Sequence, residues 1–220
     1  MVKVERTFPA PASLAAEAQK ESGSYEMPDV VAQLKKDFHD KCYICELKGL
    51  QDPQVEHLLP HKGGMYRERK FDWKNLFWSC SHCNSIKNQR QYDEGILDCC
   101  QEDPEKYIAF RFSDKNEIDV SAICAEDETA VRTAKLICEV FNMRNTGMRI
   151  YRSDFRLKAL QAEMNVLFDN LEELKRNPAS KAARRKLKAL LRRESAFAAF
   201  KRGYLREHLT EYPTLKEDFI

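Results

Sequence analysis

The chain of 220 residues has no long hydrophobic run. No stretch approaches the roughly 20 consecutive apolar residues that a membrane-spanning helix needs. Its first residues, MVKVERTFPAPASLAAEAQK, contain no continuous apolar segment ahead of a cleavage-like site, so no secretory signal peptide is expected. These two absences argue against a membrane association and predict a cytoplasmic protein.

Glycine is also scarce, with 7 residues in the whole chain. None of them belongs to a Gly-rich phosphate-binding loop, so the chain is not expected to hold ATP by itself. There is no internal repeat and no low-complexity tract. The length suits one good-sized domain or two small ones, with ample residues for a hydrophobic core.

Net charge is nearly absent, at +2, and by itself does not indicate nucleic-acid binding. The distribution of charge is uneven, however. Residues 175–206 contain twelve Lys or Arg and one acid, whereas residues 93–128 contain twelve Asp or Glu and three bases. This asymmetry indicates either one surface for anionic ligands and another for a basic partner, or two solvated faces of opposite sign.

Cysteine, in contrast, is abundant, with 8 residues. In a reducing compartment these are expected to bind metal rather than to form disulfides. Cys42 with Cys45 and Cys80 with Cys83 form two Cys-x2-Cys pairs, and two such knuckles complete the four-sulfur site of a structural Zn²⁺. The other four lack this spacing and are expected to be buried thiols. They are Cys99, Cys100, Cys124 and Cys138.

The chain divides into three regions by pattern. Residues 1–28 contain three prolines and one short helix-like piece, and we expect an irregular lead-in. Residues 29–125 mix short strands, short helices and most of the cysteines. Residues 126–220 show helical periodicity. The predicted fold class is therefore α+β, with a zinc-stabilised mixed domain followed by a mostly α-helical C-terminal region.

Short elements are expected within the mixed region. Residues 54–59 and 75–79 predict two strands, and a helix is expected to start with Asn84 as its N-cap residue. The segments KYIAFRFSD and EIDVSAIC predict two more strands, joined by a turn at 114–116.

The C-terminal region predicts long helices. One is expected to start at the cap residues Ser153 and Asp154 and to end before Asn177. Residues 180–209 predict a helix with one broad apolar face, formed by Leu187, Leu190, Leu191, Phe197, Tyr204 and Leu205. The basic residues from Lys181 to Arg206 have three interpretations: contact with nucleic-acid phosphates, docking on an acidic partner, or a solvated helix face.

Two histidines four residues apart occur in VEHLLPHKGG, residues 55–64. His57 and His61 could pair as metal ligands only on a helix, and Pro60 disfavours a helix there. Without the cysteine framework, Glu56 and His57 would be interpreted as a polar pair on a surface loop. His61 is expected to contact phosphate, a neighbouring site residue or solvent.

The motifs KCYICE, VEHLLPHKGG, DWKNLFWSC and CNSIKNQ follow one another over about 50 residues. In this order they resemble the HNH endonucleases, which have a ββα-metal core. The resemblance implies that Glu56 binds a catalytic divalent ion and that His57 is the general base that activates water. It further implies that Asn75 braces the loop and orients the histidine, and that Asn84 is the second metal ligand.

The residue types suit these roles. A histidine with a pKa of about 6.5 can accept a proton from water at neutral pH. Oxygen ligands from Glu56 and Asn84 suit Mg²⁺ or Mn²⁺ better than Zn²⁺. Lys87, one helical turn after Asn84, and His61 are expected to contact the substrate.

After these motifs come the segment DEGILDCCQEDPEKYIAFRFSDKNEIDV and a helical region that ends in SAFAAFKRGYLREHL. With them the chain resembles, over nearly its whole length, the HNH subunit of Septu-type anti-phage systems. That resemblance implies an SMC/ABC-like ATPase partner that gates the nuclease, in some systems within a retron complex with a reverse transcriptase and its RNA and DNA. The expected target is nucleic acid, DNA in preference to RNA, with little sequence specificity from this chain alone.

Two alternatives remain open. The chain could be a stand-alone HNH endonuclease of the restriction or mobile-element type. It could also be a zinc-stabilised nucleic-acid-binding scaffold without catalysis, although such a scaffold has no need for Glu56, His57 and Asn84 together.

Overall fold

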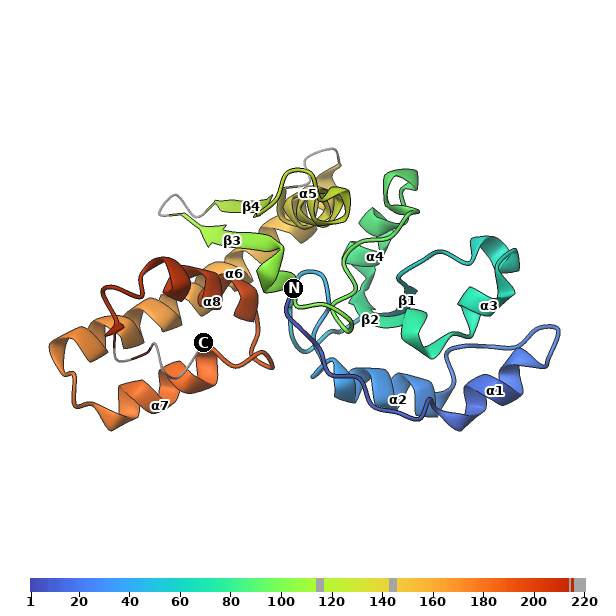
Figure 1. Ribbon diagram of the computed structural model, residues 1–220, viewed down its shortest axis with the longest axis horizontal. Helices are drawn as coiled ribbons and strands as arrows, with labels where there is room; N and C mark the ends of the chain where they lie inside the picture. Colours follow the sequence, from blue (N-terminus) through green and yellow to red (C-terminus); the bar gives the residue numbers. More distant parts are fainter. Residues whose placement is uncertain (114–116, 143–145, 214, 216–220) are drawn as a thin grey trace.

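The computed structural model describes residues 1–113, 117–142, 146–213 and 215, and it confirms the α+β class (Figure 1). The strands are β1 (Pro53–His57), β2 (Leu76–Cys80), β3 (Ile108–Phe112) and β4 (Ile118–Ala122). The helices are α1 (Ala12–Ala18), α2 (Pro28–Asp37), α3 (Arg67–Lys70), α4 (Ser81–Lys87), α5 (Glu128–Asn142), α6 (Gly147–Arg176), α7 (Lys181–Leu190) and α8 (Ala198–Glu207).

The strands form two separate antiparallel hairpins. β1 pairs with β2, and β3 pairs with β4. Figure 1 shows β1, β2 and α1 to α4 in one half of the molecule and α7, α8 and the end of α6 in the other. β3 and β4 lie above α8, and α5 lies near the middle of the molecule (Figure 1). One cluster of buried apolar residues includes side chains from Met1 to Leu215, so the two halves share a core.

The N-terminal segment is irregular, as expected, but it belongs to this core. Met1, Val2 and Val4 are buried, and the backbone N–H of Val4 donates to the carbonyl of Cys99 at 2.9 Å. Arg6 donates to the carbonyl oxygens of Trp73 and Leu76. Its guanidinium also lies 4.7 Å from the centre of the Trp73 ring, a cation–π distance.

The first hairpin has a fixed register, with His57 opposite Leu76 and Pro53 opposite Cys80. β1 ends at His57, two residues before the expected end. The N–H of Leu58 still donates to the backbone carbonyl of Asn75. The next N–H, that of Leu59, donates to the Asn75 side chain instead, so the ladder of backbone hydrogen bonds stops there.

The start of α4 differs from the expectation. Cys80 is its N-cap residue, and its sulfur accepts the N–H of Cys83 at 3.5 Å. Asn84 lies inside the helix, so its assignment as the N-cap was wrong. The reason is the second cysteine knuckle. It places a thiol at the position where a Ser, Thr or Asn oxygen usually accepts a hydrogen bond from a backbone N–H of the first turn.

The start of α6 was also placed wrongly. Thr146 is the N-cap residue, with its side chain accepting from the N–H of Arg149. Ser153 lies inside the helix, where its buried hydroxyl donates to the carbonyl of Val140 in α5. The predicted end before Asn177 is confirmed.

The single basic helix expected over 180–209 is two helices, α7 and α8. Between them Phe197 adopts a left-handed conformation, with φ of 49°, which a continuous right-handed helix does not allow. Leu187, Leu191 and Leu205 are nevertheless buried, as the apolar pattern indicated.

The first cysteine knuckle meets the start of α8 through a buried carboxylate. Glu46 accepts from the ammonium of Lys41 at 3.0 Å and from the N–H of Ala199 at 2.9 Å. Burial opposes the charge of Glu46, but Lys41 and the amino group of Met1 hold its pKa at about 2. An ionised, buried glutamate therefore connects the two halves of the molecule.

The second hairpin lies where the sequence predicted two strands, and its turn at 114–116 lies outside the described residues. β4 packs on α5, and β3 packs on α8. Over the described part of the chain, no helix combines the length and apolar character of a membrane span.

Gly203 allows α8 to approach β3, since a Cβ there would overlap the carbonyl oxygen of Phe110. We expect Gly203→Ala to lower the thermal unfolding midpoint by about 3–10 °C, because overpacking of a buried site costs about 1–3 kcal/mol. Circular dichroism measures this midpoint. Gly147→Ala is the matched control, since a Cβ at the start of α6 meets no atom within 4 Å. Equal midpoints for both variants would contradict the packing described.

Candidate functional site

The four knuckle cysteines converge, as their spacing predicted. The Sγ atoms of Cys42, Cys45, Cys80 and Cys83 all lie within 4.8 Å of one another and are buried. The sulfurs of Cys45 and Cys80 are 4.0 Å apart. A tetrahedral ion with metal–sulfur bonds of about 2.3 Å places its sulfurs about 3.8 Å apart. The cluster therefore fits a structural metal ion.

Arg156 of α6 faces this cluster, with Nη2 3.0 Å from the sulfur of Cys80. Burial opposes the charge on the guanidinium, but the nearby thiolates raise the pKa of Arg156. In return, hydrogen bonds from the neighbouring thiols and the charge of Arg156 hold the pKa of Cys80 well below its usual value. A thiolate is the form of cysteine that binds metal.

His82, between the two cysteines of the second knuckle, is not directed at the metal site. Its Nε2 lies 2.9 Å from the carbonyl oxygen of Val140 in α5. The hydroxyl of Ser153 donates to the same oxygen at 3.0 Å. α4, α5 and α6 therefore meet at one carbonyl beside the cluster.

A second site lies next to the first hairpin. A pocket of about 270 Å³ is lined by Tyr25, Val55, Glu56, His57, Pro60, His61, Lys62, Asn84 and Asn88. The structure thus brings together Glu56, His57, His61 and Asn84, four of the residues selected from the sequence. It places Asn75 and Lys87 behind them.

His57, at the end of β1, is buried and held in one orientation. Its Nε2 lies 3.1 Å from the carbonyl oxygen of Lys70, which fixes the proton on that nitrogen. Burial lowers the pKa of His57 to about 4, so the ring is neutral near pH 7. Nδ1 is then the unprotonated nitrogen, and within the described residues it has no hydrogen-bond partner.

Glu56 is buried, with both carboxylate oxygens engaged. Lys87 lies 2.6 Å from Oε1, and the hydroxyl of Tyr43 donates to Oε2 at 2.5 Å. Burial raises the pKa of Glu56, while Lys87 and Tyr43 act in the opposite direction. Each oxygen has a second lone pair, so these contacts leave acceptor capacity toward the pocket.

Lys87 is 4 % exposed, and its ammonium also donates to the carbonyls of His57 and Leu58 at 2.9 Å. All three of its protons therefore have partners within the protein. The structure places Lys87 under Glu56 and the end of β1 rather than at the pocket surface.

Asn75 fixes the loop that follows β1. Its Oδ1 accepts the N–H of Leu59 at 2.8 Å, and its Nδ2 donates to the carbonyls of Leu59 and Arg69. The Arg69 carbonyl immediately precedes Lys70, whose own carbonyl contacts His57. Asn75 thus connects both segments that surround the histidine.

His61 lies beside His57, with ring centres 4.6 Å apart. Its Nδ1 accepts the N–H of Gly64 at 3.0 Å, so Nε2 carries the proton in the neutral ring. Burial, followed by the charge of Lys70, lowers the pKa of His61. At neutral pH this histidine offers one N–H donor to the pocket.

Two tyrosines at the site were not anticipated from the sequence. The ring of Tyr25, from the N-terminal segment, is 4.5 Å from that of His57, and Tyr43 contacts Glu56 from the first knuckle. Both lie outside the segment between the knuckles, so motif spacing carried no signal for them. Arg67 and Lys70 bring Tyr25 into place by donating to the carbonyls of Ala18 and Gly23.

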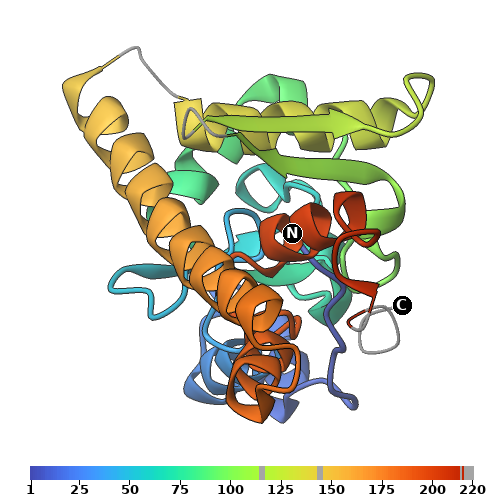
Figure 2. The ribbon, with the colours of Figure 1, turned by 90° about the vertical axis from the view of Figure 1, so that its left-hand side faces the viewer.

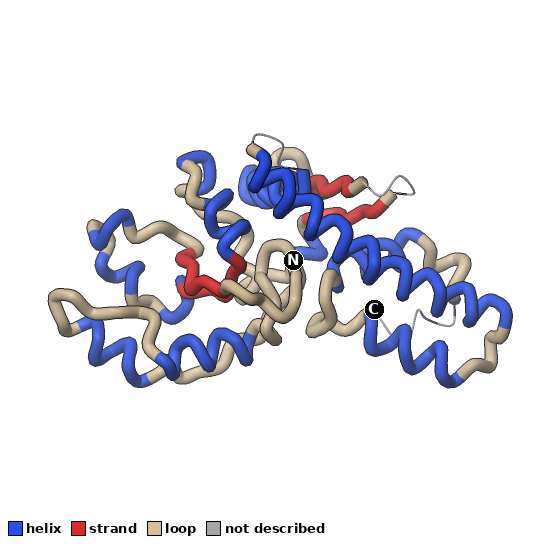
Figure 3. Tube along the Cα trace, turned by 180° about the vertical axis from the view of Figure 1, so that it is seen from behind, coloured by secondary structure: helices blue, strands red, loops and turns tan. Residues whose placement is uncertain are grey.

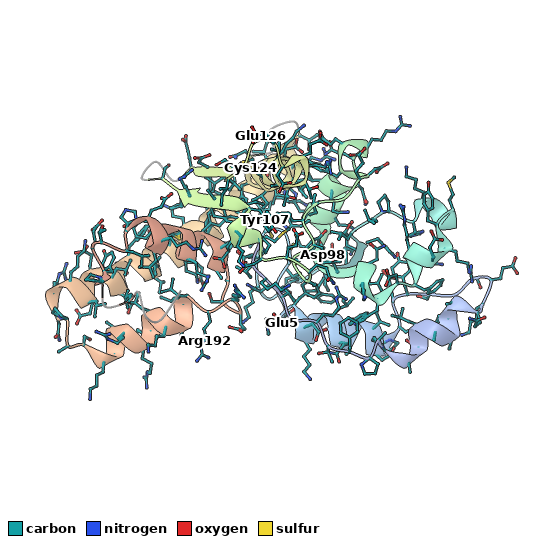
Figure 4. All side chains as sticks on the ribbon, viewed as in Figure 1. Glu5, Asp98, Tyr107, Cys124, Glu126 and Arg192 are labelled. Carbon is teal, nitrogen blue, oxygen red and sulfur yellow. The ribbon has the colours of Figure 1, made fainter. Side chains whose placement is uncertain are left out.

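The remaining cysteines are only partly the buried thiols that were expected. Cys99 is buried, and Cys100 and Cys138 are partly buried. The expectation was wrong for Cys124, which is exposed in the loop between β4 and α5. Its thiol donates to the carboxylate of Glu126 at 3.1 Å, and Figure 4 labels both residues at the edge of the molecule.

The acidic and basic segments partly neutralise each other. Glu105 accepts from Arg202 at 2.8 Å and from Arg206, and Arg193 pairs with Asp103. Neither interpretation of the charge asymmetry included this internal pairing. Other bases on and after α7 face outward: Lys181, Arg185, Lys186 and Arg192 are exposed, and Figure 4 shows Arg192 directed away from the ribbon.

No protein-family model and no curated protein matches the chain. Its function is therefore inferred from the geometry of the two sites.

We expect Cys83→Ser to lose most of the bound metal, because one ligand of the tetrahedral set is removed. The unfolding midpoint should fall by at least about 10 °C, at roughly 2–4 °C per kcal/mol for a chain of this size. Elemental analysis and circular dichroism measure the two effects. Cys138→Ser is the control, since that thiol only donates to the carbonyl of Val120. A Cys83→Ser protein with unchanged metal content would exclude the cluster as the metal site.

Proposed function

We propose that the chain is a metal-dependent endonuclease of the HNH type, which hydrolyses phosphodiester bonds. The observation that carries the proposal is the pocket beside β1. It joins an oriented, neutral His57 with two oxygen-bearing side chains, Glu56 and Asn84. No surface pair of polar residues requires burial, a fixed tautomer and a bracing asparagine.

His57 is the general base in this proposal. Its Nε2–H is held by the Lys70 carbonyl, so Nδ1 is the nitrogen that accepts a proton from the attacking water. The lowered pKa keeps Nδ1 unprotonated over the physiological range. Asn75 maintains this geometry through its three side-chain hydrogen bonds.

Glu56 and Asn84 would hold the catalytic ion, Mg²⁺ or Mn²⁺, since both offer oxygen and line the same pocket. Such an ion supplies charge stabilisation at the phosphate and the leaving oxygen. Lys87 and Tyr43 fix the carboxylate of Glu56 from behind. Lys87 accordingly has a positioning role here, and His61, with its outward N–H donor, is the better candidate for contact with the phosphate.

The four-cysteine cluster is proposed to hold Zn²⁺. An all-thiolate, buried set of four ligands leaves no open position for substrate or water, which is typical of structural rather than catalytic zinc. In this role the ion fixes both ends of the segment that carries the pocket.

The biological setting proposed is anti-phage defence, with DNA as the target and an SMC/ABC-like ATPase, in some systems with a retron, as the partner. The exposed bases of α7 support a contact with phosphates or with an acidic partner surface. A stand-alone HNH endonuclease is the alternative, and co-purification of an ATPase separates the two. A non-catalytic zinc-stabilised scaffold leaves the buried Glu56–Lys87 pair and the oriented His57 without a purpose.

We expect His57→Ala to reduce nicking of plasmid DNA by about 10²–10⁴-fold, the usual contribution of a general base. The assay contains Mg²⁺ or Mn²⁺, the ATPase partner and its trigger. His208→Ala is the control, because His208 lies on the far side of the molecule and stacks on Tyr204. Equal cleavage by wild type and His57→Ala under these conditions would falsify the catalytic assignment.

Asn84→Ala should raise the Mn²⁺ concentration needed for half-maximal cleavage by at least about tenfold, equivalent to about 1.4 kcal/mol of binding free energy. Loss of one oxygen ligand weakens ion binding, whereas excess ion should restore much of the rate. Asn170→Ala, on the outer part of α6, serves as the control. An unchanged Mn²⁺ requirement would remove Asn84 from the set of ligands.

A further inference from the structure

A stripe of apolar side chains runs along the outer face of α6. Four of the large ones are strongly exposed: Met148 by 62 %, Tyr151 by 67 %, Phe155 by 51 % and Val166 by 46 %. They make up half of the eight large apolar side chains that are exposed among the described residues. Isolated exposed apolar residues are normal, but a continuous row marks an interaction surface.

These residues share one face of the helix. Together with Ala159 and Ala162 they form a set of six residues, each three or four positions after the previous one. At about 100° per residue, all six lie within roughly 80° of the helix circumference. The core-facing residues, such as Leu160 and Leu167, lie on a different face. Figures 2 and 3 show α6 running along one side of the molecule, with α7 beside its C-terminal half.

The centre of the stripe borders a groove. Ala159 and Ala162 form one wall, and Ala189 and Leu190 of α7 form the other, around a volume of about 540 Å³. The groove is mostly apolar, and five of the ten residues that line it are alanine or serine. The alanines of α6 and α7 leave room for a bulky side chain from outside.

Before the last turn of α6, which carries Lys175 and Arg176, charge along the outer face of the helix changes sign from the first half to the second. Arg152 and Lys158 flank the stripe in the N-terminal half, and Asp169 and Glu173 flank it in the C-terminal half. All four are exposed. A parallel copy of the same helix would set like charges against each other, whereas an antiparallel copy sets opposite charges together.

We propose that α6 is a self-association surface, and that two copies of this chain pair their α6 helices antiparallel about a twofold axis near residues 158 and 159. Such an interface is isologous, so each contact occurs twice. The charge reversal along α6 favours a second copy over an unrelated partner, because the helix is complementary to itself in this orientation.

The side-chain sizes fit the same arrangement. With the axis at this point, Phe155 of one copy faces Ala162 of the other, and Tyr151 faces Val166. A large residue meets a small one, and Phe155 enters the groove beside α7. Arg152 comes within one helical turn of Asp169 of the second copy.

Sedimentation equilibrium of the full chain tests the proposal. Wild type at about 100 µM should approach twice the 25.7 kDa of one chain and should dissociate on dilution. Phe155→Glu should be monomeric, while Val131→Glu, at an exposed apolar position on α5, should leave the association unchanged. Circular dichroism verifies that both variants are folded.

Charge exchange provides the second measurement. Arg152→Glu and Asp169→Lys should each raise the dissociation constant at least about tenfold, and the double variant should recover most of the loss, since the two charges come within one helical turn of each other across the axis. A wild-type chain that stays monomeric at about 100 µM, or a Phe155→Glu chain that still dimerises, overturns the proposal. A double variant that associates more weakly than either single one overturns it as well. These readouts do not involve nuclease activity, so they stand or fall separately from the proposed function.

Discussion

The contact between Arg156 and Cys80 is the constraint on which most of the structure depends. Four thiolates around a divalent ion would carry a net charge of about −2 inside the protein, and such a charge is stable only when it is compensated and hydrogen-bonded. Arg156, in the first half of α6, would offset about half of it and donates a hydrogen bond to Cys80. The position of α6 is therefore linked to the cysteine cluster. His82 of α4 and Ser153 of α6 add to this link, because both contact the carbonyl of Val140 in α5.

The cluster in turn fixes the pocket. Cys45 and Cys80 stand at the two ends of the segment that contains the first hairpin, and a metal ion bound by the cluster would keep these ends together. The hairpin register then places Glu56 and His57 beside α4. The side chain of Asn75 holds the loop that follows His57. Under the proposed function, the general base needs its proton-accepting nitrogen in one place, and the Lys70 carbonyl and the buried Asn75 side chain fix the ring and its loop.

The sequence predicted the structure best where the spacing of nearby residues determines it. Two Cys-x2-Cys knuckles bring four thiols together in only a few geometries, so the cluster was predictable. The approximate positions of the two strands and four of the nine residues that line the pocket were predictable as well. Helix starts were less so. In α4 the thiol of Cys80 is the N-cap instead of Asn84. In α6 the N-cap is Thr146, seven residues before the expected Ser153. The contacts of Lys87 and the approach of Tyr25 and Tyr43 depend on tertiary packing, which no spacing records.

The distribution of positive charge limits how a nucleic acid can reach the pocket. Near the pocket, Lys87 is paired with Glu56, and Arg67 and Lys70 are bound to backbone carbonyls of the N-terminal segment. Lys62, which lines the pocket, is also held in an ion pair, and the exposed bases of α7 lie at the opposite end of the molecule (Figure 1). These bases around the pocket are therefore already engaged within the chain, although phosphate contacts supply most of the affinity for nucleic acid. Under the proposed function, efficient cleavage needs phosphate contacts from outside this chain, and this requirement gives a physical reason for a nuclease that acts only within an assembly.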